Sequence, residues 1–233
     1  MRRQAALDER KRRLEAARLY LICDAQPDAF LRAALSGGVD VLQLRLKDAP
    51  EQEIVAAGRR FAAAAAEHGA LFIINDRPEL VGDTGADGVH VGQEDTPVGR
   101  ARQLAGPQCL VGLSTHSREQ IERASGPEGS GGAGGFRSPE LPDYIGVGPI
   151  FTTPTKPGRP AVGLELLSYA AEHATVPFFA IGGIDERNVA RVAGAGGRRV
   201  AVVRALVQAT DPRSTAERLR AALRTERDPV GAA

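Results

Sequence analysis

Apolar and polar side chains alternate without a break between Val41 and Asp48. A period of two is typical of a β-strand, since successive side chains of a strand point to opposite faces. Gln43, Arg45 and Lys47 therefore share one face of this strand, and three leucines share the other. On a half-exposed strand of an antiparallel sheet such a polar face would be ordinary, so its meaning depends on the segments around it.

The rest of the chain alternates short apolar runs with amphipathic or alanine-rich stretches, which predicts strands and helices in turn. Expected strands cover residues 19–23, 41–48, 71–74, 88–91, 110–113, 144–147, 178–181 and 199–203. Expected helices cover residues 28–36, 51–67, 98–104 and 164–173, with others starting near residues 78, 117, 185 and 214. This alternation favours a parallel sheet covered by helices. Eight strands fit a closed barrel, so we expect an α/β protein with a single (β/α)8 TIM barrel.

The predicted barrel spans residues 19–225, with an extra polar helix before it at residues 1–18 and a tail after it at residues 226–233. One segment breaks the rhythm, because residues 126–142 are rich in Gly, Ser and Pro and contain almost nothing to bury. This composition predicts a solvated, disordered insertion. The alternation of strands and helices resumes beyond the insertion, which is therefore not a domain boundary.

Composition narrows the class of protein. The 233 residues suit one barrel, and a net charge of +1 with 4% aromatic residues argues against a nucleic-acid partner. No apolar run is long enough for a membrane span, and the charged N-terminus lacks the apolar core of a signal peptide. Cys23 and Cys109 lie in apolar strand-like runs and are expected to be reduced, buried thiols. We expect a cytoplasmic protein without a nucleic-acid or membrane partner, and we leave open whether it forms a homo-oligomer.

Chemically capable residues gather where the predicted strands end, and in a TIM barrel these ends form the mouth of the active site. They are Arg45, Lys47, Asn75, Asp76, Asp95, Ser114, Thr153, Thr155, Lys156, Gly182 and Gly183. Each alone is more often a helix cap or a turn residue. Together, the carboxylates of Asp76 and Asp95, with Asn75 or waters, make a set of oxygen ligands that suits Mg²⁺. Arginine and lysine side chains beside them would bind phosphate oxygens, which predicts a diphosphate site.

A second phosphate site is predicted at Gly182-Gly183, where barrels commonly bind phosphate on backbone N–H groups after the seventh strand. Val203 and Arg204 follow the eighth strand and would complete that site. The alternative is that these glycines serve only tight turns. Without the neighbouring residues, the two interpretations carry about equal weight. His90 is interpreted as a hydrogen-bonded core histidine. No Ser-His-Asp set and no His or Cys metal motif is visible, which favours electrostatic catalysis.

The order and spacing of these motifs resemble those of the thiamine-phosphate synthase family over residues 19–212. The motifs are Gln43-Leu-Arg-Leu-Lys47, Asn75-Asp76, His90-Val-Gly-Gln-Glu-Asp95, Gly112-Leu-Ser114, Gly146-Val-Gly-Pro-Ile-Phe151, Thr153-Pro-Thr-Lys156 and Ile181-Gly-Gly-Ile184. The resemblance implies a (β/α)8 barrel that joins hydroxymethylpyrimidine diphosphate to a plain or carboxylated thiazole phosphate, releasing pyrophosphate and giving thiamine phosphate. It also implies a dissociative loss of pyrophosphate assisted by Mg²⁺.

The resemblance assigns residues to three groups. The pyrimidine diphosphate would be held by Gln43, Leu44, Arg45, Leu46, Lys47, Asn75, Ser114 and Lys156, of which Arg45, Lys47, Ser114 and Lys156 would be catalytic. Mg²⁺ would be held by Asp76 and Asp95, and the thiazole phosphate by Thr153, Thr155, Gly183, Val203 and Arg204. Many relatives carry Ser in place of Arg204. An arginine there adds a charge if backbone N–H groups bind the phosphate, and weakens thiazole binding if the hydroxyl matters.

Two alternatives remain open at this point. One is a thiazole tautomerase of the same family, an isomerase that needs no diphosphate site. Retention of the polar residues at positions 43, 45, 47, 76 and 95 argues against it. The other is a non-catalytic protein that binds a phosphate ligand, for which the chain shows no effector or DNA-reading element.

Overall fold

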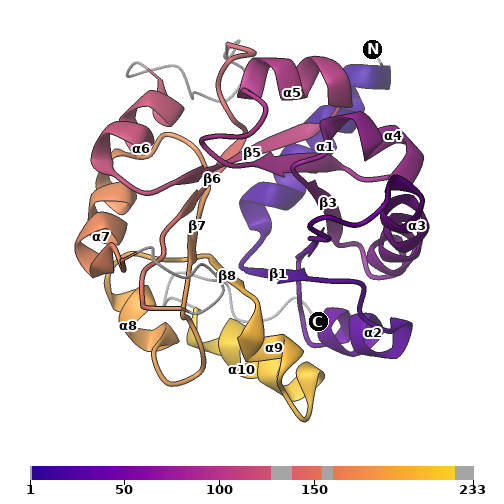
Figure 1. The fold of residues 1–233 in the computed structure, drawn as a ribbon. Helices are drawn as coiled ribbons and strands as arrows, with labels where there is room; N and C mark the ends of the chain where they lie inside the picture. Colours follow the sequence, from indigo (N-terminus) through magenta and orange to yellow (C-terminus); the bar gives the residue numbers. More distant parts are fainter. Residues whose placement is uncertain (1, 127–137, 154–159, 224–233) are drawn as a thin grey trace.

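Eight parallel strands close into a barrel in the computed structural model, which describes residues 2–126, 138–153 and 160–223 (Figure 1). Each strand pairs with the next one along the chain, and β8 returns to pair with β1. Helices surround the barrel, so the expected (β/α)8 architecture is confirmed. The tail at residues 226–233 and most of the Gly-rich insertion lie outside the described residues.

The strands are β1 (Leu19–Cys23), β2 (Val41–Leu44), β3 (Leu71–Asn75), β4 (Gly88–Val91), β5 (Leu110–Thr115), β6 (Tyr144–Val147), β7 (Phe178–Ile181) and β8 (Val200–Val202). The strand predicted over residues 41–48 is wrong at its end, because β2 stops at Leu44. Its neighbour β1 ends at Cys23, whose carbonyl accepts the Arg45 N–H at 2.8 Å, and no further strand partner follows. The chain then turns through Asp48, which has a φ of 61°, into the next helix.

The helices are α1 (Arg2–Ala16), α2 (Asp28–Ser36), α3 (Glu51–Glu67), the 3₁₀ turn η1 (Pro78–Leu80), α4 (Val81–Thr84), α5 (Val98–Ala105), α6 (Arg118–Ser125), α7 (Gly163–His173), α8 (Val189–Gly194), α9 (Arg204–Val207) and α10 (Pro212–Ala222). The helices from α2 onward bury apolar faces against the outside of the barrel. None of the described helices combines the length and apolar character that a membrane span needs.

Side-chain alternation divides the apolar residues into two cores. Leu42 and Leu44 point outward into the layer between strands and helices. The neighbouring positions point inward and fill the barrel, and this interior set is Tyr20, Ile22, Val41, Leu71, Ile73, Leu110, Tyr144, Phe179 and Ala201. Gln43 alternates with Leu42 and Leu44 and is 2% exposed, so a polar amide lies inside the barrel. Both cysteines are free and buried, as expected from the sequence.

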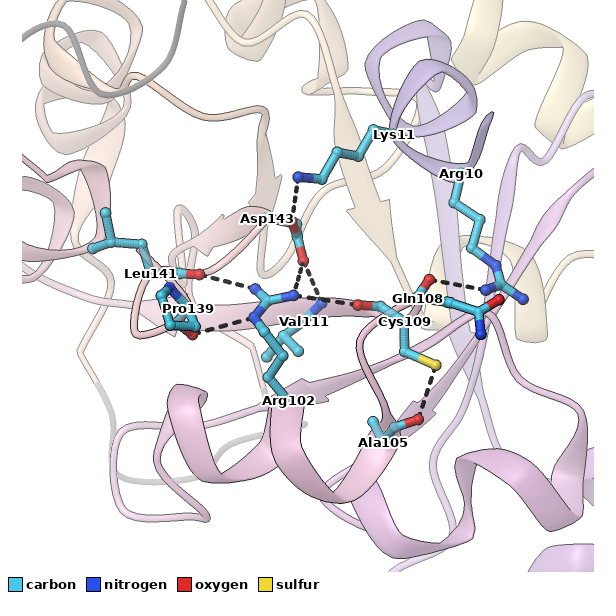
Figure 2. A network of polar contacts seen from close by, with 10 residues as sticks. All are labelled: Arg10, Lys11, Arg102, Ala105, Gln108, Cys109, Val111, Pro139, Leu141 and Asp143. Atoms are coloured by element: carbon cyan, nitrogen blue, oxygen red, sulfur yellow. Dashed lines mark hydrogen bonds and ion pairs between the residues drawn. The ribbon is translucent and has the colours of Figure 1, made fainter. Parts of the chain in front are cut away.

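Helix α1 covers the N-terminal end of the barrel and leaves the opposite end for a site. Leu14 of α1 packs against the interior set. Lys11 pairs with Asp143 at 3.2 Å, and Asp143 also binds Arg102 at 3.0 Å and accepts the Val111 N–H at 2.9 Å (Figure 2). A carboxylate that caps a strand in this way fixes both the strand start and the helix below it.

Two other aspartates at this end of the barrel also precede a strand and accept a backbone N–H of a neighbouring strand. Asp40 precedes β2 and accepts the Leu19 N–H at 2.9 Å, and Asp87 precedes β4 and accepts the Phe72 N–H at 3.0 Å. Asp87 also binds Arg10 of α1 at 2.8 Å. These carboxylates satisfy backbone donors that would otherwise lack partners at the strand starts. Their role is structural, and the chemistry must be sought at the other end.

Candidate functional site

Two carboxylates meet at the mouth of the barrel, where β3 and β4 end. Asp76 follows β3 with a φ of 59°, and its backbone N–H donates to the His90 carbonyl at 2.9 Å. This left-handed conformation, which Asp tolerates better than most residues, turns the half-buried side chain toward Asp95. Burial, followed by the charge of Asp95 and a hydrogen bond with it, raises the pKa of Asp76 to about 6. Asn75 and the positive charge of Arg45 oppose this rise in the pKa.

A tight turn after β4 sets the position of Asp95. Its Oδ2 accepts the Gly92 N–H at 2.8 Å, and a Cβ added at Gly92 would lie 2.7 Å from that oxygen. The turn therefore requires glycine if the carboxylate is to stay near Asp76. Asn75 donates through Nδ2 to Asp76 Oδ2 and so adjoins the pair.

The two carboxylates fit a small divalent cation, whereas Asn75 does not offer the oxygen ligand considered from the sequence, because its Nδ2 faces Asp76 and its Oδ1 accepts from Gln43. Two carboxylates close enough to hydrogen-bond raise the cost of ionising both, and a cation between them would remove that cost. Among the residues that the structure describes, no group of three or more His, Cys, Asp or Glu side chains could hold a metal ion. Mg²⁺ needs no such cage, because it commonly binds one or two carboxylates together with waters and substrate phosphates.

A chain of polar side chains, buried at its centre and half-buried at its ends, runs inside the barrel from Asn75 to Ser114. Gln43 Nε2 lies 2.7 Å from Asn75 Oδ1, and Gln43 Oε1 lies 2.7 Å from the Tyr20 hydroxyl. The Tyr20 and Tyr144 hydroxyl oxygens are 3.0 Å apart. The chain continues from Tyr144 to His90 Nδ1 at 3.3 Å, and from His90 Nε2 to Ser114 Oγ at 3.0 Å. His90 is thus hydrogen-bonded at both ring nitrogens, as interpreted from the sequence, although its imidazole is half-buried rather than fully buried.

The other half of the mouth contains a cavity of about 220 Å³ between the ends of β5, β6, β7 and β8. Of the residues predicted to bind the thiazole phosphate or to act at the diphosphate, the cavity brings together Thr153, Gly183, Val203, Arg204 and Ser114. The cavity lining does not include Asp76 and Asp95. The mouth is therefore divided into a carboxylate half and a cavity half, with Ser114 at the cavity and hydrogen-bonded toward the other half through His90.

Two explanations account for glycine at positions 182 and 183, one from packing and one from ligand binding. Their φ values are 101° and 66°, which favour glycine, and a Cβ at Gly183 would lie 2.8 Å from the Thr152 carbonyl oxygen. The turn is held by the Phe151 N–H, which donates to the Gly182 carbonyl at 3.0 Å. Within the described ranges, the N–H of Gly183 has no hydrogen-bond acceptor. The tight-turn interpretation thus accounts for the glycines, and the N–H group stays available to a bound anion.

Several predicted site residues lie elsewhere. Lys47 is exposed beyond the end of β2, and Leu44 is 1% exposed and faces the helices, so its side chain does not reach the mouth. Leu46 packs at the edge of the same outer core. Thr155 and Lys156 lie outside the described residues.

Sequence reasoning missed Tyr20 and Tyr144, which form the middle of the buried chain. A signal existed, because two of the three tyrosines in the chain occupy inward positions of predicted strands. It also missed Gln93, whose amide donates to the Ser114 carbonyl at 2.6 Å, and Arg187, which lines the cavity while paired with Asp185 at 2.6 Å. Loop residues of this kind carry no periodic pattern that would have marked them.

Comparison with known proteins gives consistent matches. The family model described as thiamine monophosphate synthase matches residues 19–206. A thiamine-phosphate synthase of Arthrobacter sp. (strain FB24) is 44% identical over 234 residues, covering 90% of this chain and 95% of that protein. One of Gloeobacter violaceus is 46% identical over 205 residues, covering 87% of this chain but 56% of that longer protein. The structure of a thiamine phosphate pyrophosphorylase from Pyrococcus furiosus superposes with a TM-score of 0.76 at 32% identity, covering 88% of this chain and 95% of that one.

Proposed function

This chain belongs to the thiamine monophosphate synthase family, and from that membership we propose that it is a transferase that forms thiamine phosphate. Its substrates would be hydroxymethylpyrimidine diphosphate and a plain or carboxylated thiazole phosphate, and pyrophosphate would be released. The observation that carries the proposal is the Asp76–Asp95 pair beside Arg45, next to a separate cavity that can take a second phosphate ligand.

The carboxylate half of the mouth would bind the diphosphate. Asp76 and Asp95 would hold Mg²⁺, and Arg45 lies close enough for its charge to lower the pKa of Asp76. Lys47 projects from the loop after β2 and could approach the outer phosphate, while Leu44 and Leu46 could contribute only backbone groups. Asn75 and Gln43 would contact the pyrimidine side of the substrate. Lys156 is expected to add a further positive charge.

The cavity half would bind the thiazole phosphate. Gly183 offers a backbone N–H, and Thr153 and Arg204 line the same cavity. Val203 precedes Arg204 and places its backbone at the cavity wall. We expect Thr155, which belongs to the same motif as Thr153, to share in this contact. Arg204 adds a positive charge that a serine at this position would not supply.

The chemistry follows from where charge develops. Loss of pyrophosphate leaves positive charge on a pyrimidine that can delocalise it, and negative charge builds on the leaving group. Mg²⁺, when bound, would neutralise part of that negative charge. Arg45, Lys47 and Lys156 would stabilise the rest, and the Ser114 hydroxyl would donate a hydrogen bond to the leaving group. The thiazole nitrogen is already nucleophilic, so no general base is needed.

A reducing compartment suits this chain. Both cysteines are free and buried, and burial raises the pKa of the Cys23 thiol, which keeps it protonated and unreactive. On this basis we place the enzyme in the cytoplasm.

The direct test measures pyrophosphate release from hydroxymethylpyrimidine diphosphate, with and without thiazole phosphate, in Mg²⁺ or in EDTA. We expect release that depends on both substrates and on the metal, together with formation of thiamine phosphate. Turnover of a thiazole tautomer alone would instead identify an isomerase. Binding of both phosphates without turnover would leave a phosphate-ligand binder.

A further inference from the structure

Two tyrosines at the centre of the barrel are linked to the carboxylate pair by hydrogen bonds, although neither lies in it. Tyr20 and Tyr144 are 2% and 1% exposed and pack around Phe179, with ring centroids 5.2 Å and 5.8 Å from it. A phenol hydroxyl in such a core is costly unless it is hydrogen-bonded. Both hydroxyls are bonded, and they lead through Gln43 and Asn75 to Asp76. Phenylalanine would fill the same space, so the hydroxyls need a further reason.

The Asp76 carboxylate, at one end of this chain of hydrogen bonds, determines the direction of every bond that follows. An ionised carboxylate only accepts, so Asn75 turns its Nδ2 group to Asp76. Asn75 Oδ1 is then the acceptor for Gln43 Nε2, which leaves Gln43 Oε1 to accept from the Tyr20 hydroxyl. Burial raises the pKa of Tyr20, so its hydroxyl keeps the one proton that it donates.

The hydrogen bond between the two tyrosines also has only one possible direction. Tyr20 has used its only proton on Gln43, so across the 3.0 Å contact the Tyr144 hydroxyl must be the donor. Tyr144 can then only accept from His90 Nδ1, 3.3 Å away. Every donor in the chain therefore points from His90 toward Asp76, and each amide has one orientation that satisfies both neighbours.

We propose that Tyr20 is a positioning residue that orients the Gln43 and Asn75 amides, and through them holds the Asp76 carboxylate in place for a cation bound with pyrophosphate. Tyr144 supports Tyr20 by donating a hydrogen bond to its hydroxyl oxygen. The inference rests on the proposed function for its cation and its anion, and on the hydrogen-bond chain for its residues. If a substitution removes the Tyr20 hydroxyl, Gln43 Oε1 loses its donor. Both side-chain amides can then flip, and Asn75 can turn its oxygen toward Asp76.

The backbone of the barrel is shaped to keep this chain in place. Gly112 of β5 lies beside Tyr144, and a Cβ there would lie 2.2 Å from Tyr144 Cζ and 2.5 Å from His90 Nδ1. The glycine thus leaves the space that the ring and the imidazole occupy. The rings of Tyr144 and His90 also lie against each other in a tilted arrangement, with centroids 5.5 Å apart.

The test measures binding of Mn²⁺ in the presence of pyrophosphate, a readout that does not depend on turnover. We expect Tyr20→Phe to weaken this binding about 10-fold, the lower end of the range for losing a group that orients a metal ligand directly, because Tyr20 acts through two intervening amides. Tyr144→Phe should weaken it by less than about threefold, because Tyr20 keeps its proton and still donates to Gln43. Tyr169→Phe is the matched control, since it removes the hydroxyl of the third tyrosine, which is bonded to Glu122 on the surface.

A double-mutant cycle separates positioning from packing. Because Tyr20 acts through Asn75, Tyr20→Phe should have less than about a twofold effect in an Asn75→Ala background. Additive losses would show that the tyrosine merely packs and would overturn the proposal, as would a Tyr144→Phe loss equal to or larger than that of Tyr20→Phe. If Tyr20→Phe melts early, Gln43→Glu provides the second variant: its second carboxylate oxygen would face Asn75 Oδ1, and binding should again fall about 10-fold or more.

The outcome is separable from that of the proposed function. A protein that shows this coupling but forms no thiamine phosphate would keep the positioning role and lose the synthase assignment. A protein that forms thiamine phosphate but binds Mn²⁺ and pyrophosphate equally well after Tyr20→Phe would keep the assignment and lose the positioning role.

Discussion

Replacing Asp95 by asparagine should make the metal-free protein more stable at pH 8. Asp76 has a pKa of about 6 in place of its ordinary 3.8, so the native state resists ionising this carboxyl. At about 1.4 kcal/mol for each tenfold change in proton affinity, the penalty has a ceiling of about 3 kcal/mol. Asp76 is only half-buried, so solvent screening lowers that ceiling, and burial rather than Asp95 is the largest cause. We therefore expect Asp95→Asn to stabilise the protein by about 1 kcal/mol.

The sign of this effect depends on pH. A carboxyl whose pKa is higher in the folded state than in the unfolded state costs no stability below pH 3.8, where both states are protonated. Stability is lost as the pH rises from there to about 6, and the loss is constant above that value. The gain from Asp95→Asn should therefore be full at pH 8 and absent near pH 4. The variant keeps an oxygen for the Gly92 N–H, so the turn itself is preserved.

The assay is thermal unfolding in EDTA at both pH values, then in Mg²⁺ with pyrophosphate. A gain of about 1 kcal/mol raises the Tm of a chain of this size by about 2–4 °C. Ligand at 100 times its Kd adds about 2.7 kcal/mol to the wild type, and little to a variant without the second carboxylate, so the order of the two Tm values should reverse. An Asp95→Asn variant that melts below the wild type in EDTA at pH 8, or that differs equally at both pH values, would refute the reasoning.

Three further predictions concern other residues of the mouth and of the barrel interior. Arg45→Ala, and likewise Lys156→Ala, should lower turnover about 10²–10³-fold without changing the circular dichroism spectrum; a loss below threefold with normal Mg²⁺ dependence would count against their role. Gly112→Ala should destabilise the protein by about 1–3 kcal/mol, since its Cβ would overlap Tyr144, and a Tm within one degree of wild type would contradict that geometry. Arg204→Ser should raise the KM for thiazole phosphate several-fold with kcat nearly unchanged if the guanidinium contacts the phosphate; an unchanged or lower KM would show that backbone groups suffice.

The Gly-rich segment and the motif after Thr153 show where sequence reasoning could not be followed into the structure. Composition predicts that residues 126–142 form a solvated insertion, but residues 127–137 lie outside the described part of the chain. The same holds for Thr155 and Lys156, which enter the proposed site only through the resemblance. Their roles stay predictions that the kinetic tests above address.

Sequence periodicity alone predicted the barrel, which the structure confirms, and the end at which we expect its active site. Alternation of short apolar runs with helical stretches leaves few ways to bury both faces of a parallel sheet, and in a closed barrel the strand ends converge at one mouth. Alternation within residues 41–48 also placed Gln43 opposite Leu42 and Leu44, and the structure agrees. It did not determine where β2 ends, because that depends on the length of the neighbouring β1.

Only the tertiary structure decided which polar residues meet. Tyr20 and Tyr144 are 124 residues apart in the chain, and their hydroxyls touch because barrel closure brings inward side chains of distant strands to one axis. The raised pKa of Asp76 likewise needs Asp95 from the next strand end. Local pattern reports the face on which a side chain lies. Contact across the barrel depends on the strand register, on the size of the aromatic rings and on the glycines that leave room for them. These factors relate residues that are neighbours in space but distant in the sequence.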